Sequence, residues 1–259
     1  MSVLDKIETI KLNSVKVYET GESTGYETGK AEGYNAGYEK GKAEAEPAGD
    51  SHYDTFWDMY QENGNRTDYS SAFEKRWTND TFKPKYDIVA TSAKSLFYDS
   101  PLEGDLVEHL NGLGVSLDLS RATTADSAFR NTKLTRIGVV DLTGITSYDY
   151  GTSYLFYYAG ELETIDKLIM KKEVRFWSSF YNNKSLKNIT FEGVIGRNFE
   201  LTRCPALTKE SLLSAINVLE DKTTDTSGTT YTVTLGSTNL SKLTDEEIAV
   251  ATEKGWTVV

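Results

Sequence analysis

Cysteine and histidine are almost missing from this sequence. One cysteine, Cys204, and two histidines, His52 and His109, are present among 259 residues. A single cysteine cannot form an intrachain disulfide, and the set is too small for a structural zinc site. The two histidines fit no metal-ligand pattern such as H-E-x-x-H, so we expect no metal and no cofactor. Stability must come from side-chain packing, for which 38% hydrophobic residues are enough.

The sequence also has no excess of basic residues and no long apolar run. Lys plus Arg number 28 against 39 Asp plus Glu, which gives a net charge of -11. Such a chain repels phosphate backbones, so we expect no nucleic-acid partner. No stretch approaches transmembrane length, and the first residues include Asp5 and Glu8, unlike a signal peptide. We expect no membrane insertion, and we expect the chain to stay in the cytoplasm or to join a larger particle, unless a signal-free route exports it.

The motifs of common catalytic sites are missing too. The sequence has no serine-centred elbow and no phosphate-binding loop with its strand and lysine. With 39 acidic side chains in the chain, the sequence does not distinguish the catalytic carboxylate pair of a glycosidase from an acidic face exposed to solvent. Cys204 is followed by Pro205, so no helix N-terminus lowers the pKa of its thiol. We therefore expect a binding protein without catalytic residues, not an enzyme.

What the sequence does contain begins with a glycine repeat in residues 1-50. A helix of this sequence would bring glycines onto a slowly winding line that lets helices approach closely. Each glycine costs about 1 kcal/mol relative to alanine, so such a helix needs partners. The segment is either an attachment or oligomerisation stalk or a solvated linker. The glycines recur at every fourth position: Gly21, Gly25, Gly29, Gly33, Gly37 and Gly41.

Residues 51-90 form an aromatic-rich unit. One group of rings shares a helical face ahead of the turn at residues 63-65, and a second group recurs at four-residue spacing. We expect both groups to form core and the unit to cover the N-terminal end of the repeat that follows. The first group is Tyr53, Phe56, Trp57 and Tyr60, and the second is Tyr69, Phe73 and Trp77.

A pattern in steps of three recurs in residues 91-207: an apolar residue, a small or polar residue, leucine, then isoleucine. Repetition at tens of residues, with degenerate terminal copies, is typical of repeat architectures. The complete copies are Ala128, Asn131, Leu134, Ile137; Phe156, Ala159, Leu162, Ile165; and Phe180, Asn183, Leu186, Ile189. Partial copies are Leu96, Asp99, Leu102 and Leu201, Cys204, Leu207. We interpret the five leucines, together with Asn131, Asn183 and Cys204, as structural positions.

Strand-like runs follow the complete copies at residues 137-142, 165-170 and 189-195, and should form a parallel sheet. The intervals between the leucines shorten along the chain, so the repeat is irregular. Residues 208-259 predict a helix from Thr208, a strand at 231-235 and a short helix that opens with the capping box Thr244 and Glu247. The sequence thus predicts an α/β solenoid: a short irregular leucine-rich-repeat domain with parallel strands, preceded by the Gly-rich stalk and closed by an α/β C-terminal cap.

The pattern at residues 180-189, FYNNKSLKNI, resembles the BspA-like leucine-rich repeat, in which the small position is commonly Cys or Asn. The glycine- and tyrosine-containing stalk, the aromatic segment 56-88 and the ending 225-259 make the chain similar to repeat proteins encoded beside tail genes in phages and prophages of Gram-positive gut bacteria. The resemblance implies a phage tail or baseplate receptor-binding protein, assembled in the host cytoplasm and located in the virion. Its partners would be other tail proteins and a bacterial surface glycan or protein.

The same resemblance implies a homo-oligomer, with a trimer favoured, held through the stalk. Two alternative functions stay open. A secreted or surface-bound bacterial adhesin would use the same repeat, and a tailspike-type enzyme would cleave the glycan that it binds.

Aromatic residues are dense in and around two intervals of the repeat. Aromatic rings can stack on the apolar faces of sugars while their polar groups form hydrogen bonds. The alternative is that most of these rings cover the edges of the sheet. Our candidate ligand-binding residues are Tyr148, Tyr150, Tyr154, Tyr158, Trp177 and Tyr181, with Tyr157 and Phe176 beside them.

Overall fold

Our computed structural model describes residues 55–259, and parallel strands recur in it from Ile88 to Val258. The main sheet has the order β2 (Glu103–Asp105), β4 (Lys133–Asp141), β5 (Thr164–Met170) and β6 (Asn188–Gly193). Ile137 pairs with Ile165, and Ile165 pairs with Ile189. The predicted parallel sheet and the alignment of its isoleucines are therefore confirmed.

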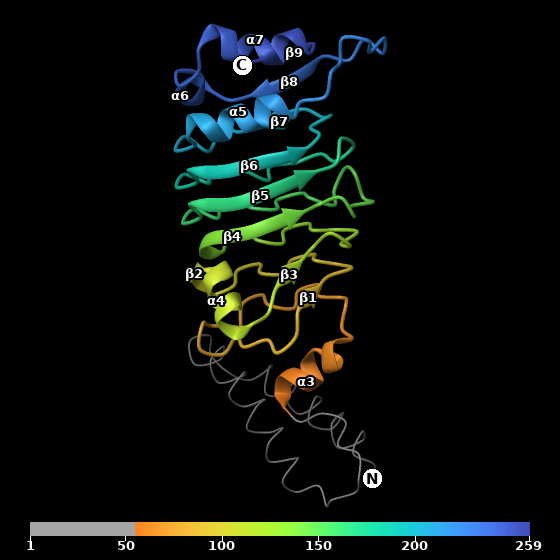
Figure 1. The fold of residues 1–259 in the computed structure, drawn as a ribbon, viewed down its shortest axis with the longest axis vertical. Coiled ribbons are helices and arrows are strands. Elements are labelled where there is room, and N and C mark those ends of the chain that lie inside the picture. The colour runs from red at the N-terminus through yellow and green to blue at the C-terminus, as the bar shows by residue number, and fades with distance from the viewer. Residues whose placement is uncertain (1–54) are drawn as a thin grey trace, which may run out of the picture.

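Two smaller parallel sheets flank the main one along the long axis (Figure 1). Strand β1 (Ile88–Val89) pairs with β3 (Leu117–Asp118) on the N-terminal side. On the C-terminal side the order is β7 (Phe199–Glu200), β8 (Tyr231–Thr234) and β9 (Trp256–Val258). The described chain is thus a mixed α/β domain with parallel sheets and few helices. The glycine stalk, His52 and Tyr53 lie outside the described residues.

Short helices occupy the two ends and one interval of the body. The predicted C-terminal helices are present as α5 (Lys209–Asn217) and α7 (Asp245–Glu253), with α6 (Ser237–Leu240) between them. Thr208 caps α5, and the capping box of Thr244 and Glu247 opens α7, as predicted. None of the helices in residues 55–259 is long and apolar enough to cross a membrane.

The repeat pattern does not predict helix α4 (Leu106–Leu113), because it shows at Asp105 only a missing isoleucine three residues after Leu102. Its carboxylate instead accepts a hydrogen bond from the backbone N–H of Glu108 and so caps the helix. Gly114, at φ 71°, ends it in the left-handed conformation that suits glycine. The longest interval between repeat leucines, from Leu102 to Leu134, therefore contains a helix.

Residues 55–90 pack as an aromatic cluster around α3 (Phe56–Tyr60) and the short η1 (Glu62–Gly64). Tyr69, Phe73 and Trp77 are buried, as expected of core residues. The ring centroids of Trp57 and Trp77 lie 4.8 Å apart.

Five irregular segments cross behind the main sheet, and we call them return segments: 71–75, 95–99, 127–131, 154–158 and 178–182. The first and fifth residues of each have positive φ. The third residue is always phenylalanine, and rings that follow one another are 5.2 to 5.7 Å apart. Backbone hydrogen bonds join neighbouring segments, as where Phe129 N–H donates to the carbonyl of Leu155. The stacked phenylalanines are Phe73, Phe97, Phe129, Phe156 and Phe180.

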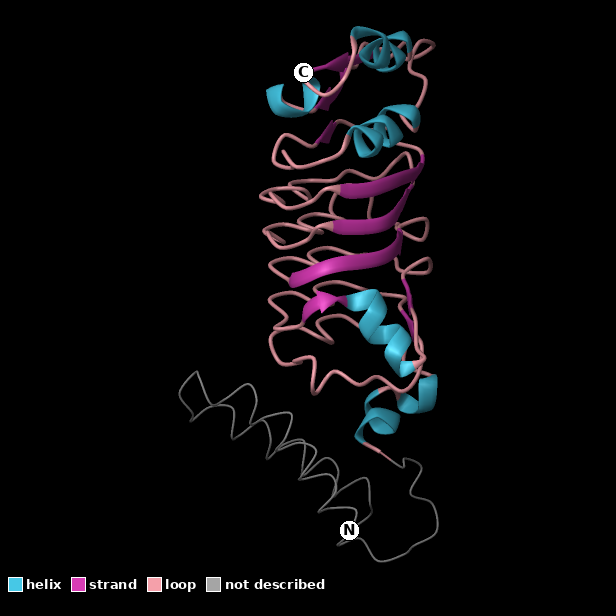
Figure 2. Cartoon of the chain, turned by 60° about the vertical axis from the view of Figure 1, so that its left-hand side comes forward, coloured by secondary structure: helices cyan, strands magenta, loops and turns pink. Residues whose placement is uncertain are grey.

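The core lies between the return segments and the sheet. Figure 2 shows the strands along one side of the body with loops crossing behind them. The ring of Phe180 lies 6.2 Å from that of Phe191 in β6. All five repeat leucines are at most 1% exposed: Leu102, Leu134, Leu162, Leu186 and Leu207.

In two copies of the repeat, the buried small or polar residue lies one position later than the sequence pattern predicts. Asn131 lies at the exposed surface, and its neighbour Thr132 takes the buried small position. Ser100 takes the same position in place of Asp99. These copies are one residue shorter before the leucine, and the Thr132 hydroxyl accepts a hydrogen bond from the N–H of Leu134. As a result Phe129, not Ala128, stands in the ring stack.

Candidate functional site

The candidate aromatic residues lie on the last two return segments and in the loops before them. Tyr150 is 74% exposed and Trp177 is 54% exposed, the two largest values among the exposed large hydrophobic side chains. Tyr148, Tyr158 and Tyr181 are also exposed, whereas Tyr154 is half-buried. The surface therefore presents several rings that the core does not use.

The structure brings some of these rings together and leaves others apart. Tyr181 stacks on Tyr157 at 5.2 Å and lies 5.7 Å from Tyr158. Tyr154 meets Tyr157 edge-on at 5.2 Å, and its N–H donates to the carbonyl of Trp177. These rings form one cluster.

Tyr148 lies on a different loop. The ammonium group of Lys171 lies 5.1 Å from the centroid of its ring. Neither Tyr148 nor Tyr150 has a ring contact with the cluster among residues 55–259.

A row of cations and rings continues the cluster, and sequence reasoning missed it. The guanidinium of Arg130 lies 5.2 Å from the ring centroids of both Tyr98 and Tyr157. That of Arg203 lies 5.4 Å from the ring of Tyr181. Tyr98, Arg130, Tyr157 and Tyr181 are each the fourth residue of a return segment. The phenylalanine before each of them is the signal that could have identified the row.

The ladder of hydrogen bonds between return segments stops at 178–182. The N–H groups of Ser178, Phe180 and Asn182 have no hydrogen-bond acceptor among residues 55–259. The next segment pairs with β8 instead, through Phe199 opposite Val233 and the Leu201 N–H that donates to Thr234. Among the described residues, no backbone hydrogen bond therefore joins 178–182 to the segment at 199–203.

The ring orientation in the phenylalanine stack also changes at this opening. The rings of Phe129 and Phe156 are nearly parallel, with 15° between their planes. Phe199 instead meets Phe180 edge-on, at 79° and 5.5 Å, and also meets Phe191 edge-on. The change in ring orientation thus coincides with the end of the backbone ladder.

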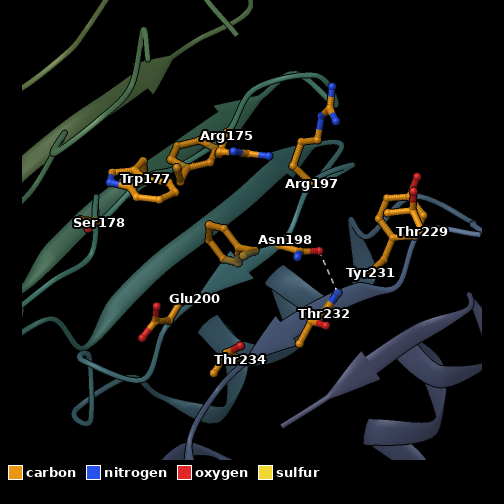
Figure 3. Close-up of a pocket in the computed structure, with 12 residues that line it drawn as sticks. Arg175, Trp177, Ser178, Arg197, Asn198, Glu200, Thr229, Tyr231, Thr232 and Thr234 are labelled. Atoms are coloured by element: carbon orange, nitrogen blue, oxygen red, sulfur yellow. Dashed lines mark hydrogen bonds between the residues drawn. The ribbon is translucent and has the colours of Figure 1, made fainter. Parts of the chain in front are cut away.

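A groove of about 610 Å³ lies at this opening (Figure 3). This volume falls within the range of small-molecule sites, about 300 to 1,000 Å³. Figure 3 shows Arg175 and Trp177 on one side and Glu200, Thr232 and Thr234 on the other. A narrower recess continues the groove to Tyr181 and Arg203. The groove is lined by Arg175, Phe176, Trp177, Ser178, Arg197, Asn198, Phe199, Glu200, Thr229, Tyr231, Thr232 and Thr234.

The charges along the groove are mostly positive and unpaired. Arg175, Arg197 and Arg203 are exposed, and none forms an ion pair within residues 55–259. Glu200 is the one carboxylate among the described residues that line the groove and its recess. The groove thus offers hydrogen-bond donors and aromatic faces.

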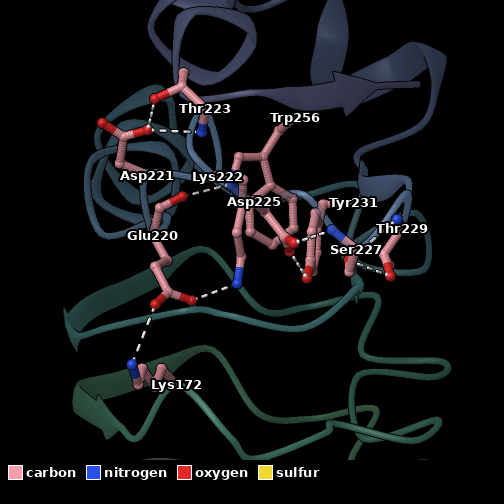
Figure 4. Close-up of polar contacts among 10 residues, drawn as sticks. All are labelled: Lys172, Glu220, Asp221, Lys222, Thr223, Asp225, Ser227, Thr229, Tyr231 and Trp256. Atoms are coloured by element: carbon pink, nitrogen blue, oxygen red, sulfur yellow. Dashed lines mark hydrogen bonds and ion pairs between the residues drawn. The ribbon is translucent and has the colours of Figure 1, made fainter.

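A polar cluster fixes the wall that carries Tyr231 (Figure 4). The hydroxyl of Tyr231 donates to Asp225, and the Lys222 ammonium lies 4.2 Å from the ring centroid. Lys222 also pairs with Glu220, whose backbone carbonyl accepts a hydrogen bond from Trp256 Nε1 at 2.8 Å. The loop between Glu220 and Tyr231 is therefore held at both ends.

The same contacts determine how the two carboxylates titrate. Hydrogen bonds from Tyr231 and Ser227 lower the pKa of Asp225 to about 2. Burial raises the pKa of Glu220, but hydrogen bonds from Lys222 and Lys172 outweigh it and the net pKa is lowered. Both groups are therefore charged at neutral pH and retain their partners.

Cys204 and His109 act as packing residues. Cys204 is fully buried, its Sγ lies 3.4 Å from the carbonyl oxygen of Phe180, and burial raises the pKa of its thiol. A neutral buried thiol is a poor nucleophile. His109 stacks on Phe82, and its Nε2 lies 2.7 Å from the Phe82 carbonyl oxygen. Within residues 55–259, no group of His, Cys, Asp and Glu side chains could hold a metal ion.

Asn183 occupies the same position in its copy of the repeat as Cys204 does in the next copy. It is fully buried, and its side-chain amide donates to the carbonyl of Phe156 at 2.9 Å.

Comparison of the chain with family models, with curated proteins and with solved structures gives no match. The groove, the aromatic cluster and the repeat pattern are therefore the observations from which its function can be inferred.

Proposed function

We propose that this protein is a phage tail or baseplate receptor-binding protein that recognises a bacterial cell-surface glycan or protein. In this proposal residues 91-207 are a short irregular leucine-rich-repeat solenoid, with residues 51-90 and 208-259 covering its two ends. Four of the five return segments lie in residues 91-207 and support the repeat, since each has phenylalanine at its third position and positive φ at its first and fifth. The parallel register of the isoleucines supports it as well.

The observation that carries the proposal is the exposed Trp177 on the wall of an open polar groove. Sugar rings have apolar faces that stack on aromatic side chains, and hydroxyl groups that need hydrogen-bond partners. Thr232 and Thr234 offer such partners on the other side (Figure 3), and Tyr181 adds a second ring at the recess. This combination favours a glycan over a flat protein surface.

The setting in a phage tail rests on the resemblance of the repeat and its flanking segments. Residues 1-50 would attach the chain to other tail proteins or hold a trimer together. A bacterial surface adhesin with the same groove would bind in the same way, so the two settings differ in location and not in recognition.

A glycan-cleaving function has less support. Glycosidases commonly use two carboxylates on either side of the bond that they cleave. Glu200 stands alone among the groove-lining residues that the structure describes. Binding without cleavage is therefore the function that the groove favours.

The test is binding of the full-length chain to intact Gram-positive cells, measured by flow cytometry over a concentration series. Trp177→Ala should weaken binding at least about tenfold, which corresponds to about 1.4 kcal/mol. Val139→Ala is the matched control, because Val139 is exposed to a similar extent but lies on β4 of the sheet. Binding that is equally strong for both variants would contradict the proposal.

A further inference from the structure

We propose that the groove beside Trp177 selects an acidic glycan, one whose sugars carry carboxylate or phosphate groups. This inference rests on the proposed glycan-binding function and names the class of ligand. It comes from three features of the groove: its unpaired arginines, its unpaired backbone N–H groups and its position in an acidic chain.

The arginines provide the first argument. Arg175 and Arg197 line the groove, and Arg203 lines the recess that continues it. A guanidinium presents donors in a planar fork that matches the two oxygens of a carboxylate or phosphate. Because none of the three has a carboxylate partner within residues 55–259, each is free to bind an anion.

The backbone provides the second argument. In the preceding return segment the N–H groups of Tyr154, Phe156 and Tyr158 all donate to carbonyl oxygens of the next segment. The equivalent N–H groups are those of Ser178, Phe180 and Asn182, and within residues 55–259 they meet no acceptor. Ser178 and Phe180 line the recess together with Glu200 and Arg203. Ligand oxygens can take the place of the missing carbonyl groups.

Two of the three buried side-chain oxygens without a hydrogen-bond partner among the described residues lie next to the opening in sequence, and the third, Ser153 Oγ, lies before the preceding return segment. Asn183 Oδ1 and Thr202 Oγ1 have no hydrogen-bond partner within residues 55–259. Asn183 follows the last return segment, and Thr202 lies on the segment after the opening. Buried polar atoms are normally satisfied. Two such atoms therefore accompany the unpaired N–H groups of Ser178, Phe180 and Asn182, and one lies on the ladder before them.

The balance of charge provides the third argument. The whole chain has a net charge of -11, which repels anions at long range. Against this background the groove and its recess carry three arginines and one glutamate. Glu200 can accept a hydrogen bond from a sugar hydroxyl, while the excess positive charge remains for an acidic group. A neutral polymer would leave these arginines without partners.

The test uses the full-length chain with three immobilised polymers, measured by biolayer interferometry. Polygalacturonate supplies carboxylates, poly(glycerol phosphate) supplies phosphates, and dextran is neutral. We expect binding to at least one acidic polymer, at least about tenfold tighter than to dextran, and weaker as salt rises from about 50 to about 500 mM. Which acidic polymer binds identifies the source of the anion.

Variants connect this binding to the groove. The double variant Arg175→Ala/Arg203→Ala should weaken binding of the acidic polymer at least about tenfold. Arg121→Ala is the matched control, since Arg121 is exposed, forms no ion pair within residues 55–259 and lies outside the groove. Nuclear magnetic resonance should show the amides of Ser178, Phe180 and Asn182 shifting with a galacturonate or glycerol-phosphate oligomer. The paired amides of the preceding return segment should stay unchanged.

The outcomes separate the two proposals. Binding to neither acidic polymer overturns the acidic-glycan inference, and so does binding to dextran that needs Trp177 but not the arginines; both leave the proposed function standing if Trp177→Ala still weakens binding to cells. Cell binding that is insensitive to Trp177→Ala removes the proposed function. Acidic-polymer binding that is unchanged in the double variant also overturns the inference, because it places the site elsewhere.

Discussion

The outer face of the main sheet and the groove beside Trp177 differ in whether their charged side chains form ion pairs. On the sheet face, acidic and basic side chains of neighbouring strands pair with each other. At the groove, three arginines have no carboxylate partner within residues 55–259. The sheet-face pairs are Lys133–Glu103, Arg136–Asp105, Arg136–Asp166, Lys167–Glu192 and Lys187–Glu163, at 2.7 to 3.1 Å.

The same contrast holds for the backbone. Strands β4, β5 and β6 pair with one another along most of their length. At the groove the N–H groups of Ser178, Phe180 and Asn182 have no acceptor within residues 55–259. The sheet face is thus satisfied by the chain itself, whereas the groove leaves donors available. This difference is what one expects between a structural surface and a binding surface.

The largest effect should come from the core that both faces share. Phe156→Ala removes a fully buried ring from the middle of the phenylalanine stack and should lower the free energy of unfolding by about 3 to 5 kcal/mol. Equilibrium denaturation by urea measures the loss. Tyr158→Ala is the control, because Tyr158 is 45% exposed on the same return segment and should cost less than about 1 kcal/mol. Similar losses for both would mean that the stack is not a core element.

The prediction of the fold from sequence was most successful where the repeat alternates apolar residues. Leucine and isoleucine recur at buried positions, and their spacing alone aligns Ile137, Ile165 and Ile189, which pair in the sheet. It failed by one residue at Asn131, because the shorter copy places Thr132 inside and sequence spacing alone does not reveal a deletion.

The groove could be predicted only in part. The density of exposed rings pointed to the region of Trp177 and Tyr181. At the opening, the segment at Phe199 and Glu200 pairs with β8, more than thirty residues later in the chain, and the ring of Phe199 lies edge-on to Phe180. No local pattern records either of these, so Arg175, Arg197 and Arg203 did not stand out among the other basic residues.

A smaller effect should distinguish the two faces directly. Arg136→Met breaks both pairs of a sheet-face arginine that is 40% exposed, so the free energy of unfolding should fall by no more than about 1 kcal/mol. Binding of acidic polymer should be unchanged. Arg175→Met should do the reverse, with weaker binding and a stability change within about 0.5 kcal/mol. The two measurements are urea denaturation and biolayer interferometry. A loss of binding in Arg136→Met would erase the distinction between the faces.

The smallest effect concerns the wall that carries Tyr231. The pKa of Asp225 is lowered to about 2 by hydrogen bonds from Tyr231 and Ser227, below its ordinary value of 3.8. A lowered pKa means that the carboxylate favours the folded loop above pH 3.8, and that this contribution is lost as the pH falls through about 2. Nuclear magnetic resonance should therefore show the amides of Thr229 and Tyr231 shifting with a midpoint near pH 2, over the range in which circular dichroism shows a folded chain.

Asp225→Asn tests whether this carboxylate is the cause. An asparagine side chain does not titrate, so the amide shifts near pH 2 should disappear while Lys222 still lies over the ring of Tyr231. Because Asp225 is on the surface, the variant should change the global unfolding midpoint little at neutral pH. Amides that continue to titrate in the variant would assign the acid response to another carboxylate, with Glu220 the nearest choice since Lys222 binds it too. The acid response of the groove wall that carries Tyr231 would then come from the contact between Glu220 and Lys222 and not from Asp225.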